Sequence, residues 1–291
     1  MSNQIGSFPR RIICLTEETT ETLYLLGEQD RIVGISGYTV RPPEARRDKP
    51  KVSAFINAKF DKIMALEPDL VFAFSDLQAD IAAELIRRGV NVFTFNQRSV
   101  DEILDMILTV GRVVGSDGAE ALVNELVAGL DAVRESAAKF PFRPRVFFEE
   151  WHDPLISGIR WVDELIEIAG GDTVFPELRE QQAAKDRIIE PGRIVKADPQ
   201  VIIGSWCGRQ VKKNLIRTRP GWGRIDAVRN DHIYEVKSTY VLQPGPAALT
   251  EGIKQIHAIL AHWAGLEIDR SLRPEGKQDP ALSAEAKTNA A

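Results

Sequence analysis

Residues 117–140 constrain the fold more than any other stretch, because they predict one long helix between two similar halves of the chain. The stretch contains no proline, and its alanine and leucine residues recur at helical spacing. At about 1.5 Å per residue, such a helix would be roughly 36 Å long. Short apolar runs alternate with amphipathic stretches on both sides of it. This alternation predicts an α/β protein with two lobes, each built on a mostly parallel sheet.

The same alternation gives the expected domain boundaries. Residues 1–116 form an N-terminal α/β lobe, residues 117–140 the linking helix, and residues 141–265 a C-terminal α/β lobe. Residues 266–291 are polar and poor in large apolar side chains, so we expect them to be a disordered tail.

Two stretches with one pattern support the two-lobe interpretation. Residues 65–76 read ALEPDLVFAFSD, and residues 196–207 read KADPQVIIGSWC. Each joins the end of a helix, an acidic residue and a proline to a short apolar strand that is followed by small or polar residues. Because the two stretches occupy equivalent places in the two lobes, we expect Phe74–Asp76 and Trp206–Cys207 to contact one ligand from opposite sides.

Two local predictions concern the first lobe. Thr19 or Thr20 is expected to cap a helix that stops at Gly27. The proline-rich stretch 39–50 is expected to be a loop without regular structure.

The polar residues that follow each strand are the first candidates for a binding site. Ligands of open parallel sheets bind outside the carboxyl ends of the strands. In the first lobe the residues just past the predicted strands are 16–18, 75–78 and 96–98, and in the second lobe they are 149–153 and 206–209. We expect these residues to line a cleft between the lobes.

Aromatic and cationic side chains in these stretches suit a large flat ligand. Trp151, Trp161 and Trp206 can each stack on such a ligand and bury a large area at low entropic cost. Trp161 lies within a predicted helix, where a place in the core is an equal alternative. Arg160 and Arg209 can clamp an anionic group in a bidentate manner, or they can be solvated loop residues.

Glu149, Glu150 and His152 carry groups that bind either metals or polar ligands. On a strand, Glu149 and Trp151 share one face, whereas Glu150 and His152 share the other. A metal site needs three or four convergent ligands, so we favour polar contacts to a ligand and predict no metal site.

The composition excludes several classes of protein. The chain has 291 residues and a formal net charge of −5, which argues against a nucleic-acid-binding surface. No stretch approaches the roughly 18 apolar residues of a membrane span. The two cysteines cannot form a disulfide framework. The motifs GxGxxG, GxxxxGK[ST] and GxSxG do not occur, so we predict a protein that is not an enzyme and needs no cofactor.

Three phrases resemble a known family: RIICLTEETTETLYLLGEQDRIVGIS, FDKIMALEPDLVFAF and PGWGRIDAVRNDHIYEV. They are similar to the cobalamin and ferric-siderophore binding proteins of ABC importers, and the resemblance covers roughly residues 10–264. It implies a class III periplasmic-binding-protein-like fold, in which a single long helix joins two α/β lobes. It also implies that the ligand is a large metal chelate, with a corrinoid as the first expectation and a ferric chelate as the second.

The resemblance assigns ligand-facing positions to residues of this chain. Phe74 and Ser75 match an aromatic–polar pair of the binding cleft, and the regions around Tyr38 and Phe55 match ligand-facing loops. In the second lobe, Trp206 and the loop 240–243 lie in the comparable places. The complete predicted ligand-binding set is Thr16, Glu17, Tyr38, Phe55, Phe74, Ser75, Asp76, Glu149, Trp151, Arg160, Trp206, Cys207, Arg209, Tyr240 and Gln243.

The resemblance also implies docking on an ABC permease through one acidic residue on each lobe. Asp61 matches the first acid, but Arg224 stands where the second is expected. The N-terminal apolar run IICL is shorter than the roughly 7–15 residues of a signal peptide. We therefore expect a cytoplasmic protein as the sequence is written, and a periplasmic protein if a leader has been removed. We further expect a monomer.

Two alternatives stay open beside the transport-type protein. A cytoplasmic binding, storage or sensing protein could use the same cleft for a ferric chelate or another small molecule. An enzyme could use Glu149, Glu150 and His152 there, since paired carboxylates with separated pKa values can act as acid and base. A degenerate binding fold that now binds another protein is a third class.

Overall fold

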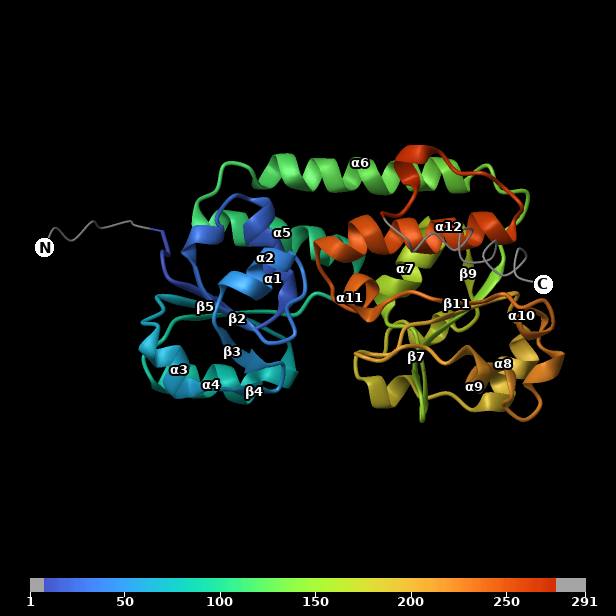
Figure 1. Cartoon of the computed structure of the whole chain (residues 1–291), viewed down its shortest axis with the longest axis horizontal. Helices are drawn as coiled ribbons and strands as arrows, with labels where there is room; N and C mark the ends of the chain where they lie inside the picture. The colour runs from blue at the N-terminus through green and yellow to red at the C-terminus, as the bar shows by residue number, and fades with distance from the viewer. Residues whose placement is uncertain (1–7, 276–291) are drawn as a thin grey trace, which may run out of the picture. The chain divides into compact units, whose positions relative to one another are not determined.

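The computed structural model describes residues 8–275 and divides into two compact units (Figure 1). Unit 1 runs to Gln97 and includes Asp101–Glu125, whereas unit 2 comprises Arg98–Val100 and the chain from Leu126 onward. Each unit has its own sheet with helices on both faces. The predicted fold class, α/β with two mostly parallel sheets, is confirmed.

The sheet of unit 1 has the strand order β4-β3-β2-β1-β5-β6. Its strands are β1 (Ile12–Cys14), β2 (Ile32–Ser36), β3 (Lys51–Ala54), β4 (Asn57–Ala58), β5 (Leu70–Phe74) and β6 (Val92–Phe95). All neighbouring pairs are parallel except β3 and β4. The central strands β1 and β5 are apolar and buried throughout, because helices cover both faces of a parallel sheet.

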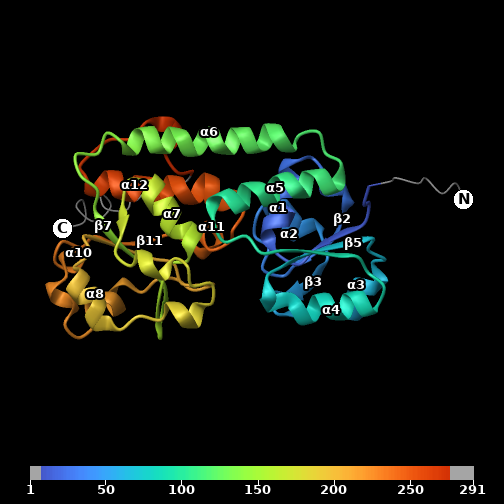
Figure 2. The ribbon, with the colours of Figure 1, turned by 180° about the vertical axis from the view of Figure 1, so that it is seen from behind.

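Alternate residues of β1 and β5 point to opposite faces of this sheet. Helices α3 (Phe60–Ala65) and α4 (Ala79–Arg87) cover one face, where Ile13 and Val71 pack against Ile63 and Leu85. Helices α1 (Glu17–Leu25) and α5 (Val100–Val114) cover the other face, as the two opposite views agree (Figure 2).

The sheet of unit 2 has the strand order β11-β10-β7-β8, and β9 pairs with the start of β7. Its strands are β7 (Arg145–His152), β8 (Leu155–Ser157), β9 (Asp172–Thr173), β10 (Val201–Gly204) and β11 (Ile233–Glu235). β10 is parallel to both β7 and β11, and β8 is antiparallel to β7.

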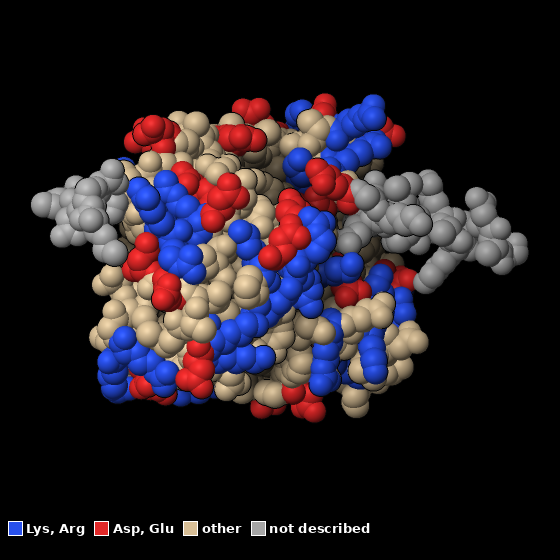
Figure 3. All heavy atoms as spheres, turned by 60° about the vertical axis from the view of Figure 1, so that its left-hand side comes forward, with Lys and Arg blue, Asp and Glu red and all other residues tan. Residues whose placement is uncertain are grey.

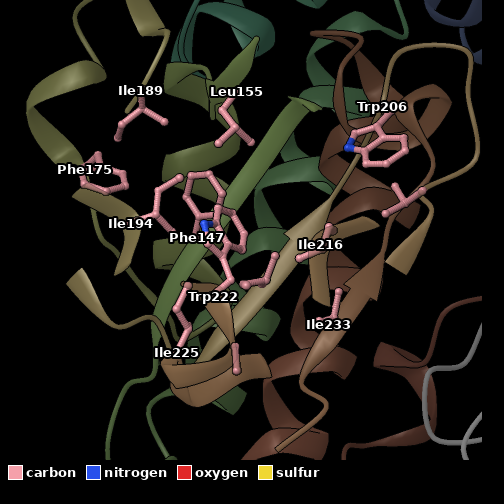
Figure 4. Close-up of a cluster of buried hydrophobic side chains, with 13 residues drawn as sticks. Phe147, Leu155, Phe175, Ile189, Ile194, Trp206, Ile216, Trp222, Ile225 and Ile233 are labelled. Carbon is pink, nitrogen blue, oxygen red and sulfur yellow. The ribbon is translucent and has the colours of Figure 1, made fainter. Parts of the chain in front are cut away.

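Helices also cover both faces of this second sheet. Helices α8 (Pro191–Ala197), α9 (Lys213–Arg217) and α10 (Asp226–Arg229) lie on one face, and α7 (Arg160–Ile168) and α12 (Ile253–Trp263) lie on the other. Phe147 and Trp222 lie at the centre of the core on the first of these faces, with Ile194 and Ile216 from the helices around them (Figure 4). Trp206 lies at one side of the same cluster.

The predicted long helix is α6, which spans Ala119–Ala137. It has 19 residues and crosses the boundary between the two units, which falls after Glu125. Predicted tail residues 266–275 include a 3₁₀ turn at Arg270–Leu272, in which Leu272 is buried. The rest of the predicted tail lies outside the described residues.

Two local predictions are wrong. Helix α1 begins at Glu17 with Thr16 at its N-cap, so neither Thr19 nor Thr20 caps it. Glu17 and Glu18 occupy the first turn, where carboxylates favourably oppose the positive end of the helix dipole. The stretch 39–50 contains the helix α2 (Pro43–Asp48), because Pro43 stands in the first turn, where a missing N–H costs no hydrogen bond.

The surface carries both signs of charge. On the face drawn in Figure 3, Lys and Arg side chains lie among Asp and Glu side chains. Several surface charges of the described residues are paired, for example Arg88 with Glu84 at 2.8 Å. Within residues 8–275, no helix is long and apolar enough to cross a membrane.

Candidate functional site

The sheet of unit 1 brings every ligand-binding residue predicted in this unit to one edge. The parallel strands all end at that edge, and the predicted residues follow directly: Thr16 and Glu17 after β1, Tyr38 after β2, Phe55 after β3, and Phe74, Ser75 and Asp76 at the end of β5. Tyr38 is 60% exposed, whereas Phe74 is 7% exposed. Of these side chains, Tyr38 and Asp76 are therefore the most accessible to a ligand.

The strand order places a topological switch point between β1 and β5. From β1 the chain moves outward to β2 and β3 on one side, and it then returns to β5 and β6 on the other side. The loops after β1 and β5 therefore leave toward opposite faces of the sheet, and such a switch point is where open α/β sheets bind ligands. Thr16–Glu18 and Ser75–Gln78 lie at this switch point.

Ser75 holds an unusual backbone conformation at the end of β5. Its φ of 59° and ψ of 177° fall in a region that residues other than glycine rarely adopt. Such a conformation costs about 1–3 kcal/mol and persists where surrounding contacts fix it. The Ser75 N–H donates to the Phe95 carbonyl at 2.7 Å, and its hydroxyl accepts from the Leu77 N–H at 3.2 Å.

The start of α1 brings buried ionisable groups to the same edge. Glu17 and Glu18 are 6% and 4% exposed. Burial raises the pKa of the Glu18 carboxyl, and the Thr16 hydroxyl bonded to it offsets part of this rise. Burial also raises the pKa of the neighbouring Cys14 thiol to about 12, so Cys14 is a protonated core residue at neutral pH.

In unit 2, the end of β10 lies beside Glu149 in the second half of β7. Gly204 pairs with Glu149 in the parallel register, and the Ser205 N–H donates to the Glu149 carbonyl at 2.9 Å. The structure thus brings the predicted stretches 149–153 and 206–209 together at the carboxyl edge of this sheet.

Glu149 is fully buried and is held by two side chains. Its carboxylate accepts a hydrogen bond from the Trp206 indole N–H at 2.9 Å and a bidentate pair from the Arg219 guanidinium, one bond of which is 2.9 Å. The guanidinium lies over the Trp222 ring, 4.4 Å from its centroid. Glu149 is therefore an anchor inside unit 2, because both of its oxygens are already engaged.

Trp206 is buried with Glu149, since 2% of it is exposed and it belongs to the apolar core cluster. Its indole N–H points inward to the carboxylate, which explains why this ring is drawn into the unit. Sequence reasoning placed Trp206 on the cleft wall because a complete apolar strand precedes it, and that reasoning did not foresee the buried acceptor.

Glu150 is engaged in the same way by another arginine. The Arg187 guanidinium donates to Glu150 at 2.6 Å and to the Ser157 carbonyl at 2.6 Å, and Arg187 is 1% exposed. The enzyme alternative needs a carboxylate that is available to substrate, whereas Glu149 and Glu150 are both neutralised by arginines. Within residues 8–275, no group of three or more His, Cys, Asp or Glu side chains could hold a metal ion.

A group of neighbouring planar side chains lies at the end of β7, in which Trp151 stacks on His152 and Trp206 is tilted against it. The His152 ring lies 5.2 Å from the Trp151 ring and 4.3 Å from the Trp206 ring. The Arg209 guanidinium lies over the Trp151 ring, 5.3 Å from the ring centroid. Trp151 and His152 are half-buried, so this group, which we call the aromatic shelf (Trp151, His152, Trp206 and Arg209), has accessible members.

The remaining predicted residues of unit 2 have varied surroundings. Arg160 begins α7 and pairs with Glu164 at 2.8 Å. Tyr240 lies in the short helix α11 (Ser238–Val241), and Gln243 follows it; both are half-buried. Cys207 is an exposed cysteine. Trp161 belongs to the core, since it is 3% exposed and its indole donates to the Val241 carbonyl at 2.8 Å.

Sequence reasoning missed three residues that organise these edges. Arg219 and Arg187 neutralise the two glutamates, and nothing in their local sequence signals those distant partners. Gln78 lies in a stretch that was expected at the site, but its own role was not foreseen. A polar side chain four residues after a strand end was the available signal.

These features define a class of protein: an α/β ligand-binding protein with two sheet units. Residues 12–240 match the family model described as "Periplasmic binding protein". The chain belongs to this family.

Curated relatives carry names of binding proteins. The chain is 29% identical to an uncharacterized ABC transporter substrate-binding lipoprotein, YvrC of Bacillus subtilis, over 88% of this chain and 82% of the relative. It is 24% identical to the vitamin B12-binding protein of Vibrio vulnificus (strain YJ016), over 89% of this chain and 92% of the relative.

Solved structures share the fold. The periplasmic vitamin B12 binding protein BtuF of Vibrio cholerae aligns with a TM-score of 0.71 at 21% identity, over 89% of this chain and 99% of that one. The periplasmic heme-binding protein BhuT, in complex with two hemes, aligns with a TM-score of 0.73 at 22% identity, over 89% of this chain and 100% of that one.

The buried pair of Glu149 and Arg219 should dominate the stability of unit 2. Arg219→Met removes the countercharge of the buried Glu149 carboxylate and leaves it only the Trp206 indole N–H as a donor. We therefore expect the free energy of unfolding to fall by about 3–5 kcal/mol. Urea unfolding measures this loss. Arg217→Met is the matched control, because Arg217 pairs at the surface with Asp231, and we expect a loss within about 1 kcal/mol. Equal losses in the two variants would contradict this account of Glu149.

Asp163 predicts how stability depends on pH. Burial raises the pKa of this carboxyl to about 7, against the Arg179 charge that lowers it. The pKa of an Asp carboxyl in the unfolded chain is about 3.9, so the folded state keeps this proton to a higher pH than the unfolded state does. The ionisation of Asp163 therefore lowers the free energy of unfolding progressively as pH rises from about 4 to 7.

Asp163→Asn should remove that slope and raise the free energy of unfolding at pH 8, by up to about 4 kcal/mol. Urea unfolding between pH 4 and pH 8 measures it in both proteins. Parallel stability curves over this range would show that the Asp163 carboxyl does not titrate there.

Proposed function

We propose that this protein binds a large flat metal chelate, a corrinoid first, as a substrate-binding protein of the ABC-transporter type. The observation that carries the proposal is the aromatic shelf at the carboxyl edge of the unit 2 sheet. Trp151 is half-buried and lies against the His152 ring at 5.2 Å. Pre-stacked rings of this kind offer a rigid apolar face to a planar macrocycle at low entropic cost.

The relatives support a metal chelate as the ligand class. The names of the curated relatives include vitamin B12-binding and cobalamin-binding proteins, and a heme-binding protein shares the fold. Trp206 is buried, so we propose Trp151 as the stacking ring and assign Trp206 to the support beneath the shelf. We propose that Tyr38, Asp76, Cys207 and Arg209 supply accessible contacts from the strand ends of their units.

A permease partner follows from the transport-type function and is part of the proposal. Asp61 lies in the first turn of α3 with a fully exposed side chain, 3.6 Å from the Arg88 guanidinium, and we propose it as the docking acid of unit 1. Arg224 stands where the resemblance places the second acid, and we propose that docking on unit 2 depends on another group. A monomer that carries one chelate is the simplest form of this proposal.

Calorimetric titration with cyanocobalamin, dicyanocobinamide, hemin and a ferric hydroxamate tests the ligand class. We expect saturable binding of the two corrinoids. Saturable binding of hemin or the ferric hydroxamate alone would replace the corrinoid by another chelate. No heat with any of the four at high micromolar concentration would overturn the proposal.

Trp151→Ala should weaken corrinoid binding at least about tenfold, which corresponds to about 1.4 kcal/mol of lost stacking. Trp263→Ala is the control, because Trp263 ends α12 and packs on Phe142, which precedes β7 at the opposite edge of the sheet. We expect the control to bind like the wild type. An unchanged dissociation constant for Trp151→Ala would remove the shelf from the site.

A further inference from the structure

Gln78 connects three strand-end loops of unit 1 and is itself fully buried. Its side-chain carbonyl accepts from the Phe74 N–H at 2.9 Å, at the end of β5. Its side-chain amide donates to the Phe55 carbonyl at 2.7 Å, just past β3, and to the Leu15 carbonyl at 3.4 Å, just past β1. One side chain thus contacts the backbone directly before Thr16, at Phe55 and directly before Ser75.

Two of these loops adopt backbone conformations that are unfavourable for their residues. Phe55 has a φ of 41° and Ser75 a φ of 59°, both in the region that favours glycine. Such conformations relax unless neighbouring contacts hold them. The contacts of Gln78 reach the Phe55 backbone itself and the residue that immediately precedes Ser75, so this side chain is placed to hold both.

The chemistry of the contact requires a neutral amide. A glutamine offers an acceptor on one side and donors on the other, which matches one N–H and two carbonyls. An ionised glutamate of the same length would set a carboxylate oxygen against the Phe55 and Leu15 carbonyls. A methionine would fill the space but would leave the three backbone groups without this partner.

We propose that Gln78 is a positioning residue for ligand binding: it fixes the loops that carry Thr16, Phe55 and Phe74–Asp76 in one arrangement before the ligand arrives. The inference rests on the proposed function, because it concerns how the same strand-end residues are preorganised. Preorganisation raises affinity by removing the cost of ordering loops during binding. Gln78 itself is buried and makes its contacts to backbone rather than to the ligand.

If Gln78 only stabilised the fold, its loss would lower the Tm without weakening ligand binding more than the loss of a comparable contact elsewhere. The amino edge of the same sheet supplies the comparison, because Arg11 donates to the Leu66 carbonyl at 2.6 Å and from its Nε to the Glu67 carbonyl at 3.0 Å. Glu67 also has a positive φ, of 46°. Arg11 therefore holds a comparable loop that lies away from the carboxyl edge.

The test compares Gln78→Met with Arg11→Met at a temperature where both are folded, using cyanocobalamin in calorimetry and thermal unfolding. We expect both variants to have a lower Tm. We expect the dissociation constant to rise at least tenfold in Gln78→Met and to stay within twofold of wild type in Arg11→Met. Wild-type affinity in folded Gln78→Met, or equal weakening in both variants, would overturn the proposal.

Gln78→Glu provides a second measurement that does not depend on whether Gln78→Met folds. Once protonated, the introduced carboxyl again has one donor and one acceptor, so it can restore most of the amide contacts. We expect its affinity relative to wild type to recover as the pH falls from 8 to 5. A pH-independent ratio would overturn the role of the amide.

Amide hydrogen exchange without ligand separates this proposal from the proposed function. In Gln78→Met we expect faster exchange at residues 55–57 and 75–77, and no such change in Arg11→Met. If the wild type binds none of the chelates, the proposed function fails, and faster exchange at these loops still supports the positioning of the strand ends by Gln78. Unchanged exchange would overturn it whatever the ligand.

Discussion

The constraint on which the structure depends is that parallel strands must return through helices. Each return brings the next strand to the same edge, so the carboxyl ends of β1, β2, β3, β5 and β6 meet at one edge in unit 1. In unit 2, β7, β10 and β11 do the same. The positions of the candidate residues follow from this rule, although they are far apart in the sequence.

Buried polar groups fix both edges in detail. In unit 1, Gln78 is hydrogen-bonded to the strand-end loops. In unit 2, Glu149 joins Trp206 and Arg219, which come from two different segments of the chain. Burying such groups is unfavourable unless every donor and acceptor is matched. At both carboxyl edges, these matched contacts fix the loops that carry the candidate residues.

Much of the fold could be predicted from the sequence because alternating apolar runs report local periodicity. The parallel strands, the long helix α6 and the strand-end placement of Thr16, Phe74 and Trp151 follow from that signal, whereas the antiparallel strands β4 and β8 do not. The helix α2 escaped it, since prolines mask a helix when they stand in its first turn.

The site was less predictable because its key contacts join distant residues. Trp206 has the sequence signature of a cleft residue, yet Glu149, 57 positions earlier, draws its indole inward. The partner of Glu149, Arg219, lies 70 positions further along the chain. No local pattern encodes such pairs, and they decide which rings remain accessible.

Hydrogen exchange with and without saturating cyanocobalamin tests the central claim most directly. We expect slower exchange at the carboxyl-edge loops, in 16–18 and 75–78 of unit 1 and in 151–153 and 206–209 of unit 2, with no change at the amino edges around Arg11 and Arg145. Protection confined to the amino edges, or to surfaces away from the strand ends, would contradict it.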